Sequence, residues 1–158
     1  MGNCSTYRLL YFVAMTRPIQ SDGRVHGAIV GCRGEDGRWL LIRRCLTMPA
    51  APGKVCFPGG AIEVGESREA AAVREFREEV GVEAELVRHV WHHVSPAKPL
   101  VLWGWLGRLK SYDLRPDPKE VHEVLWLDTH DAAHHPDALP FHNEFVFALE
   151  KAIGDSPA

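Results

Sequence analysis

The sequence has little that marks secreted, membrane-spanning or nucleic-acid-coating proteins. Its four cysteines are scattered without a C-x-x-C pair, which argues against a disulfide framework and favours a reducing, cytoplasmic location. The apolar run at residues 9–15 is far shorter than the roughly 20 residues that span a bilayer, so no membrane partner is expected. A formal net charge of −3 gives no electrostatic reason to bind long nucleic acid. A small phosphorylated ligand stays compatible with this charge, because a bound cation can reverse the local field.

Length and composition predict one folded domain with short ends. A chain of 158 residues suits a single hydrophobic core, and its 46% hydrophobic and 25% charged residues are ordinary for a globular protein. No internal repeat or low-complexity segment divides it. We expect residues 1–23 to form an N-terminal extension, residues 24–153 the domain, and residues 154–158 a short tail.

Apolar segments separated by turn residues predict a strand-rich domain. We expect strands at residues 25–32, 39–44, 82–94, 100–106 and 121–127. Residues 34–37 are typical of a hairpin turn between the first two strands. The tripeptide Pro58-Gly59-Gly60 instead predicts an irregular segment with an exposed backbone carbonyl or amide.

Two helices are predicted among these strands. The clearer one covers residues 67–80, with Ser67 as N-cap and Gly81 at the position where a terminating glycine belongs. A closing helix is expected at residues 141–153. Many strands with one central and one closing helix favour a mixed α+β domain in which a sheet lies between helices.

The first predicted helix carries a cluster of carboxylates. At about 100° per residue, its apolar residues share one side, and its acidic residues lie on the adjacent side; the two sets are Ala72, Val73, Phe76 and Val80, and Glu75, Glu78 and Glu79. The three carboxylates repel one another, and a divalent cation such as Mg²⁺ or Mn²⁺ would remove that cost. Arg74 and Glu78, four residues apart, can form an ion pair. Taken alone, these residues could also be a solvated acidic face.

The residues around this cluster follow a longer pattern. Gly60 is followed after five residues by Glu66 and, after seven more, by Arg74-Glu75-Phe76-Arg77-Glu78-Glu79-Val80-Gly81-Val82. The pattern resembles the Nudix box, and Phe57-Pro58-Gly59-Gly60 resembles its usual lead-in. Phe76 departs from it, because a smaller aliphatic residue is more usual there. The box covers 23 residues, and the order of strands extends the likeness over about residues 24–153. The resemblance implies a Nudix-type α/β/α sandwich with a mixed central sheet.

The resemblance also implies an activity and a set of site residues. Nudix hydrolases cleave a nucleoside diphosphate linked to another group, with Mg²⁺ or Mn²⁺ as cofactor. The metal ligands would be Glu75, Glu78, Glu79 and the backbone carbonyl of Gly59. Glu75 or Glu120 would take the proton of the attacking water, and Glu120, which we favour over Glu123, could also reach the metal. Arg74 would hold the catalytic carboxylates in position.

Four further residues are expected at the substrate, namely Arg44, Phe57, Gly60 and Asn143. Arg44 would bind phosphate, or be one of a solvated pair with its neighbour Arg43. Phe57 would stack on a base, or belong to the core. Asn143 would read a base edge, or cap the last helix.

Several readings stay open. The favoured one is MutT-like hydrolysis of a nucleoside triphosphate. ADP-ribose or a dinucleotide is the alternative substrate, for which Pro96 and Pro99 only bracket the spacing that relatives show. A catalytically silent nucleotide sensor and an isoprenoid diphosphate isomerase, which would need a catalytic cysteine such as Cys56, are the alternatives from other classes. Family members are often dimers, so a homodimer is an open expectation.

Overall fold

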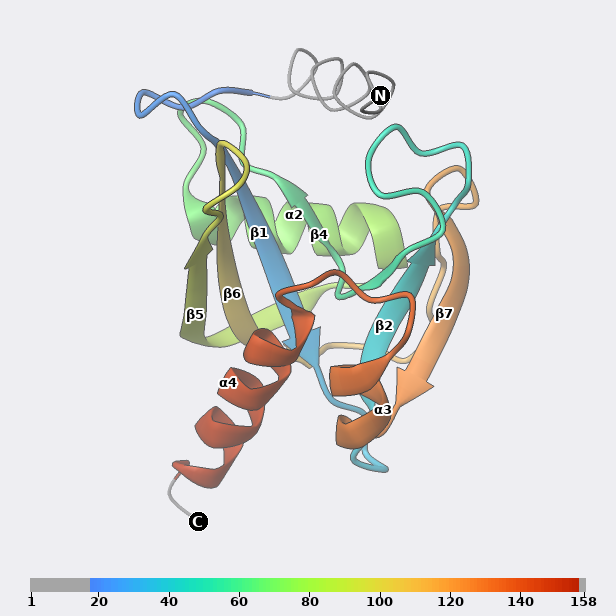
Figure 1. Cartoon of the computed structure of the whole chain (residues 1–158). Helices are drawn as coiled ribbons and strands as arrows, with labels where there is room; N and C mark the ends of the chain where they lie inside the picture. The colour runs from blue at the N-terminus through green and yellow to red at the C-terminus, as the bar shows by residue number, and fades with distance from the viewer. Residues whose placement is uncertain (1–17, 157–158) are drawn as a thin grey trace.

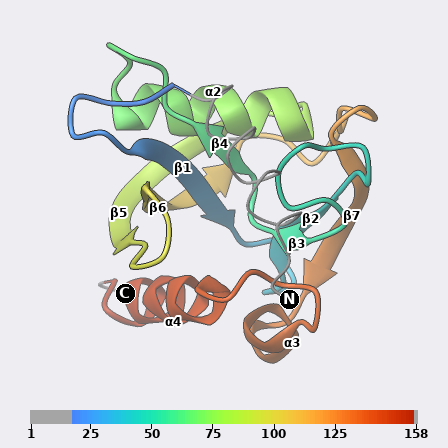
Figure 2. The ribbon, with the colours of Figure 1, turned by 45° about the horizontal axis from the view of Figure 1, so that its top comes forward.

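The computed structural model describes residues 18–156, in which strands lie between two helical layers (Figure 1). Most of the extension expected at residues 1–23 falls outside the described residues. In chain order the elements are β1 (Val25–Cys32), β2 (Trp39–Arg44), β3 (Val55–Cys56), β4 (Gly59–Ala61), α2 (Arg68–Val80), β5 (Ala84–Val94), β6 (Leu100–Leu109), β7 (Val121–Leu127), α3 (Thr129–His134) and α4 (His142–Gly154). Figure 2 shows α2 on one side of the strands, with α3 and α4 on the other.

The strands form two sheets. The first has the order β4-β1-β6-β5, in which β1 and β6 are parallel and the other neighbours are antiparallel. The second has the order β3-β2-β7 and is antiparallel throughout. One core cluster lies between the sheets and α2, and the other lies against α3 and α4. The predicted α+β class and its α/β/α sandwich with a mixed sheet are confirmed.

The predicted strands are present, but the first two do not form a hairpin. A tight turn does occur at residues 34–37, where the Gly37 N–H donates to the Gly34 carbonyl over 3.0 Å. Beyond an isolated bridge between Arg33 and Trp39, however, β1 and β2 enter different sheets. The reason is that β1 already pairs with β4 along one edge and with β6 along the other. The hairpin prediction was therefore wrong beyond its turn.

The two glycines expected in an irregular segment belong to a strand. Gly59 and Gly60 lie in β4, opposite Ile29 and Ala28 of β1. A Cβ atom on Gly59 would lie 2.1 Å from the Ala28 carbonyl oxygen, much closer than atoms can approach. The missing side chain thus permits the close pairing, and the prediction of irregular backbone was wrong.

The helix that carries the carboxylates has the predicted ends. The Ser67 hydroxyl accepts a hydrogen bond from the Ala70 N–H over 3.1 Å. At the other end Gly81 adopts a φ of 79°, and its N–H donates to the Arg77 carbonyl over 2.9 Å. The fully buried Phe76 and Val80 anchor α2 on the sheets, so the orientation of its acidic side is fixed.

The C-terminal helices were predicted less completely. The sequence analysis missed α3, whose six residues are too few to show a helical period. The closing helix α4 is present, but it begins at His142, so Asn143 lies inside its first turn and is not the N-cap. The Asn143 side-chain oxygen accepts the N–H of the next residue, Glu144, over 3.0 Å. Between residues 18 and 156, no helix is long and apolar enough to cross a membrane.

Candidate active site

The backbone of β4 faces α2 at Gly59. On either side of it, the Val30 N–H donates to the Pro58 carbonyl over 3.0 Å and the Ile62 N–H donates to the His26 carbonyl over 2.8 Å. Because hydrogen-bonded pairs alternate along an antiparallel ladder, Gly59 directs its own N–H and carbonyl away from β1. This edge of β4 therefore offers one backbone donor and one backbone oxygen to the helix.

Glu79 takes the donor that β4 offers. Its carboxylate accepts the Gly59 N–H over 2.9 Å, and the residue is only 2% exposed. Burial raises the pKa of Glu79 to about 8, although the Gly59 N–H and the charge of Arg44 oppose this; the charges of Glu75 and Glu120 raise the pKa further. The sequence predicted Glu79 on the side of the helix next to the apolar residues. This prediction was wrong, because Glu79 lies inside the protein. Glu79 of α2 thus interacts with Arg44 of β2, Gly59 of β4 and Glu120, the residue before β7.

Arg74 is the hub of the acidic groups. Its Nε and Nη2 both bind Glu66, each over 2.8 Å, while Nη1 binds Glu75 over 2.7 Å and Glu78 over 3.2 Å. The predicted pairing of Arg74 with Glu78 is confirmed. Nη2 also donates to the Ala61 carbonyl over 3.1 Å, so the same guanidinium ties α2 to β4. One cation therefore neutralises much of the charge that three carboxylates bring together.

Gly60 leaves room for Glu75. A Cβ atom on Gly60 would lie 2.2 Å from a carboxylate oxygen of Glu75. Burial raises the pKa of Glu75, hydrogen bonding and charge from Arg74 lower it, and the charges of Glu78 and Glu120 raise it again. We had expected Gly60 at the substrate, and its visible role is to admit this side chain.

Two glutamates near β7 occupy different environments. The charge of Glu120 raises the pKa of both Glu75 and Glu79, so Glu120 belongs to the same cluster. Glu123 instead pairs with Arg43 over 3.3 Å. The placement supports the choice of Glu120 over Glu123 as the additional carboxylate of the site.

Of the expected substrate residues, Gly60 and Arg44 lie near the carboxylates, whereas Phe57 and Asn143 do not. Arg44 is close enough to lower the pKa of Glu79, but its Nε donates to the Ala50 carbonyl over 2.9 Å and holds the following loop. Phe57 is 3% exposed and lies among aromatic rings, with His142 stacked at 5.0 Å. This placement favours the core alternative for Phe57. Asn143 is exposed on α4, in the helical layer on the opposite side of the strands from α2.

The donor set fits a hard divalent cation. Glu75, Glu78, Glu79, Glu120 and the Gly59 carbonyl offer only oxygen atoms, which Mg²⁺ and Mn²⁺ prefer. Burial raises the pKa of both Glu79 and Glu75, and the charge of Glu120 raises both further, so a cation at this place would favour their ionised forms. Between residues 18 and 156, no three acidic, histidine or cysteine side chains already surround one point. Glu75 and Glu78 would have to turn from Arg74 to hold a metal.

Sequence reasoning missed two features of this region. The contacts of Arg74 with Glu66 and Ala61 cross the loop that precedes α2. The fixed spacing between Glu66 and Arg74 could have suggested the contact with Glu66. His142 is 4% exposed, and its Nε2 is the buried side-chain atom without a hydrogen-bond partner in the part of the chain that the structure describes. A lone histidine at the start of a predicted helix gave no sign of this burial.

Comparison with known proteins agrees with this arrangement. The profile of the NUDIX domain matches residues 23–149, which is most of the chain. The chain belongs to the Nudix hydrolase family. The 8-oxo-dGTP diphosphatase of Escherichia coli K12 is 32% identical to this Nudix protein over 123 residues, which cover 77% of this chain and 92% of that one.

Other Nudix relatives differ in length and in named activity. Isopentenyl-diphosphate Delta-isomerase of Streptomyces griseus is 31% identical over 147 residues, covering 84% of this chain and 72% of that protein. Nudix hydrolase 3 of Caenorhabditis elegans is 44% identical over 62 residues, but the match spans only 25% of its length. Several relatives are thus much longer than the segment they share with this chain.

Solved structures show the same fold. A MutT protein from Methanosarcina mazei Go1 has a TM-score of 0.72 at 19% identity and covers 87% of this chain and 97% of its own. An ADP-ribose pyrophosphatase from Streptococcus suis has a TM-score of 0.66 at 21% identity, with 85% and 94% covered. At these identities the likeness concerns the fold alone.

Proposed function

We propose that this Nudix protein hydrolyses the diphosphate linkage of a nucleoside triphosphate, releasing a nucleoside monophosphate and pyrophosphate, with Mg²⁺ or Mn²⁺. The observation that carries the proposal is the coupled cluster of Glu75, Glu79 and Glu120 beside the backbone of Gly59. Such a set of oxygens at a strand edge suits a cation that also holds phosphate. The similarity to the E. coli 8-oxo-dGTP diphosphatase, over nearly all of that protein, supports a nucleoside triphosphate as substrate.

Each residue then has a task. Glu75, Glu78 and Glu79, with the Gly59 carbonyl, would hold the cation, which would neutralise charge on the diphosphate and make a water more acidic. Glu120 accepts the proton of the attacking water, whose oxygen bonds to phosphorus as the bridging P–O bond breaks. The leaving group, which is pyrophosphate or the nucleoside monophosphate, keeps the electron pair of that bond. Arg74 holds Glu75 and Glu78 until the cation and substrate bind.

The cellular location and the oligomeric state of the protein are also proposals. The described cysteines Cys32, Cys45 and Cys56 are free thiols, which supports a reducing, cytoplasmic setting. A homodimer is the form that the family suggests. The fold leaves the edge of β5 open within the described part of the chain.

A second candidate is isomerisation of an isoprenoid diphosphate, which the similarity to the S. griseus enzyme favours. That chemistry would need a cysteine that takes part in proton transfer. Burial raises the pKa of Cys56 to about 12, so its thiol is held neutral and exchanges a proton poorly. The intact acidic cluster favours hydrolysis.

The test is a substrate panel with product analysis, run with Mg²⁺ and with chelator. It contains 8-oxo-dGTP, unmodified nucleoside triphosphates, ADP-ribose and isopentenyl diphosphate. Release of monophosphate and pyrophosphate from a triphosphate is the expected result. Cleavage of ADP-ribose alone would replace the substrate, rearranged isopentenyl diphosphate without phosphate release would favour the isomerase, and metal-dependent binding without turnover would favour a sensor.

A further inference from the structure

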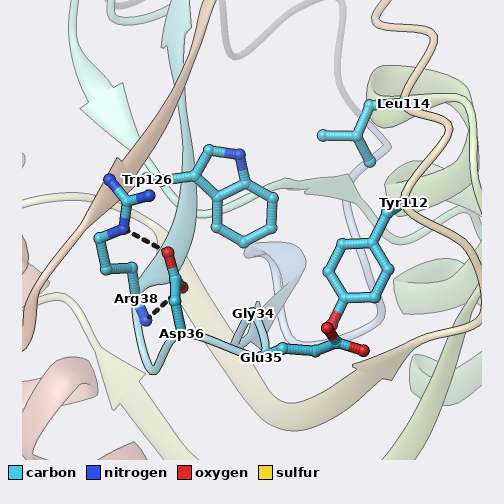
Figure 3. A pocket seen from close by; sticks show the side chains of 7 residues that line it. All are labelled: Gly34, Glu35, Asp36, Arg38, Tyr112, Leu114 and Trp126. Carbon is cyan, nitrogen blue, oxygen red and sulfur yellow. Dashed lines mark hydrogen bonds and ion pairs between the residues drawn. The ribbon is translucent and has the colours of Figure 1, made fainter.

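A cavity lies away from the carboxylates of α2. It measures about 350 Å³ and is lined by Gly34, Glu35, Asp36, Arg38, Tyr112, Leu114 and Trp126 (Figure 3). Because β2 and β7 are antiparallel, Arg44 and Val121 meet at the catalytic end, while Trp39 and Leu127 meet at the end near this cavity. Five residues of strand separate the two ends, or roughly 15–20 Å. The cavity is therefore distinct from the metal-binding end.

Two aromatic rings form its apolar wall. The rings of Tyr112 and Trp126 are nearly parallel, with centroids 6.4 Å apart and an interplanar angle of 26°. Figure 3 shows both rings with their broad faces toward the viewer and Leu114 beside them. A Cβ atom on Gly34 would lie 3.1 Å from the Trp126 indole, so the glycine keeps that ring uncovered. The wall offers a platform on which a flat ring can stack.

Tyr112 contributes little to the protein core. Tyr112 is 51% exposed, although a tyrosine that served only packing would bury its ring. It lies in the segment between β6 and β7. An exposed tyrosine held parallel to a tryptophan is the arrangement that aromatic binding platforms use.

The rim beside the platform is acidic. Asp36 is fixed by Arg38, whose Nε donates to it over 2.7 Å and whose backbone N–H donates over 3.1 Å. Glu35 is exposed and has no ion pair among residues 18–156. The rim thus carries two carboxylates and one guanidinium. Carboxylates only accept hydrogen bonds, so the rim suits a flat ring that presents N–H donors.

We propose that this cavity is a nucleobase-binding site, separate from the catalytic site, that stacks a guanine ring on Tyr112 and Trp126. Guanine presents its N1–H and its amino group side by side, and a carboxylate can accept both at once. Adenine presents one amino donor beside an acceptor nitrogen, which a carboxylate would repel. The acidic rim therefore selects guanine over adenine.

The cavity is connected to the catalytic residues through one loop. Tyr112 and Leu114 precede Asp117, whose N–H donates to the Glu79 carbonyl over 3.0 Å, and the loop ends at Glu120. The Glu120 N–H in turn donates to the Asp117 carbonyl over 3.1 Å. A base bound on Tyr112 would therefore order the loop that positions Glu120. The base could come from a free guanine nucleotide or from the far end of a dinucleotide substrate.

The test uses guanosine, which has no phosphate, in metal-free buffer, so the result does not depend on the proposed hydrolysis. By calorimetry, we expect saturable binding of guanosine to the wild type. Inosine, which lacks the amino group, and adenosine should bind more weakly. Tyr112→Ala should weaken guanosine binding about tenfold or more, and Tyr112→Phe should retain it. Phe147→Ala, which removes another exposed ring at 53% exposure on α4, is the matched control. Glu35→Gln should reduce the preference for guanosine over adenosine.

Two results would overturn the proposal: no saturable binding of guanosine by wild type, or equal binding by Tyr112→Ala and Phe147→Ala. The two sources of the base are separated by kinetics. A Tyr112→Ala change that raises KM for a diguanosine polyphosphate but not for a nucleoside triphosphate indicates a substrate base. A change in the response of turnover to added guanosine, with both KM values unaltered, indicates a free ligand. Either pattern supports the site.

Discussion

The backbone N–H of Gly59 donates to the buried carboxylate of Glu79 over 2.9 Å, and this bond joins the strand edge to the acidic helix. It places a backbone oxygen, a buried carboxylate and the neighbouring Glu75 within one electrostatic environment. The glycines of β4 are therefore part of the site and do more than permit a turn.

Substitutions of the two glycines should have different effects. Gly59→Ala places a methyl group against the rigid backbone of Ala28, so we expect loss of both stability and turnover. Gly60→Ala meets the carboxylate of Glu75, which can move. Turnover should fall about 10- to 100-fold while the melting temperature stays closer to that of wild type. Melting curves and steady-state rates check this, and a fully active Gly60→Ala protein would contradict the role of the close approach.

Substitutions of the two glutamates near β7, Glu120 and Glu123, should also have different effects. Glu120→Gln removes the proposed base, and kcat should fall about 100-fold or more. Glu123→Gln only breaks an exposed ion pair with Arg43 and should change kcat little. Both variants replace a carboxylate by its amide isostere, so they form a matched pair in the same rate assay. If Glu123→Gln proved the slower enzyme, the base would have to be reassigned.

Stability without metal should depend on Glu79. Its pKa is about 8 in the folded protein and near 4.5 in an unfolded chain, so the folded state binds the extra proton between these values. The free energy of unfolding should therefore decrease as pH rises from about 5 to 8. Glu79→Gln should flatten this decline, and Mg²⁺ should offset it in wild type only. Chemical denaturation across this range, with chelator and with Mg²⁺, measures both effects; an identical decline in the variant would contradict the burial argument.

Acid should destabilise the folded protein in part through His142. Burial lowers its pKa from 6.5 to about 4, so below pH 6.5 the unfolded chain takes up the proton more readily than the folded protein. The free energy of unfolding attributable to this residue should decrease as pH falls from 6.5 toward 4. His142→Phe, which retains a ring beside Phe57, should weaken that acid sensitivity. Denaturation at pH 7 and pH 5 tests this, and an unchanged pH difference would contradict it.

The sequence predicted local structure well where the pattern is long and repeated. Ser67, Gly81 and the apolar period between them located α2 because caps and burial are encoded within a few residues. Spacing alone also identified Glu75, Glu78 and Glu79 as a set. The burial of Glu79 could not be read from a helical wheel, because it depends on the packing of β4 against α2.

Non-local pairing was harder to predict. The turn at residues 34–37 is real, yet the strands it joins enter different sheets because β6, whose residues lie 75 positions after their partners, takes the edge of β1. The environments of Phe57 and His142 likewise arise from the packing of α4 against the strands, which no short motif records.

The most direct test of the central claim is the rate of product release (monophosphate and pyrophosphate for a triphosphate) from the best substrate of the panel, comparing Glu78→Gln with Glu69→Gln. Both glutamates lie on α2, and the Glu78 side chain is 54% exposed, so neither change should unfold the protein. We predict that wild type and Glu69→Gln turn over only with Mg²⁺ or Mn²⁺. Glu78→Gln should be slower by about 100-fold or more at an unchanged melting temperature. Equal rates for the two variants, or full turnover in chelator, would contradict metal-dependent hydrolysis at this carboxylate cluster.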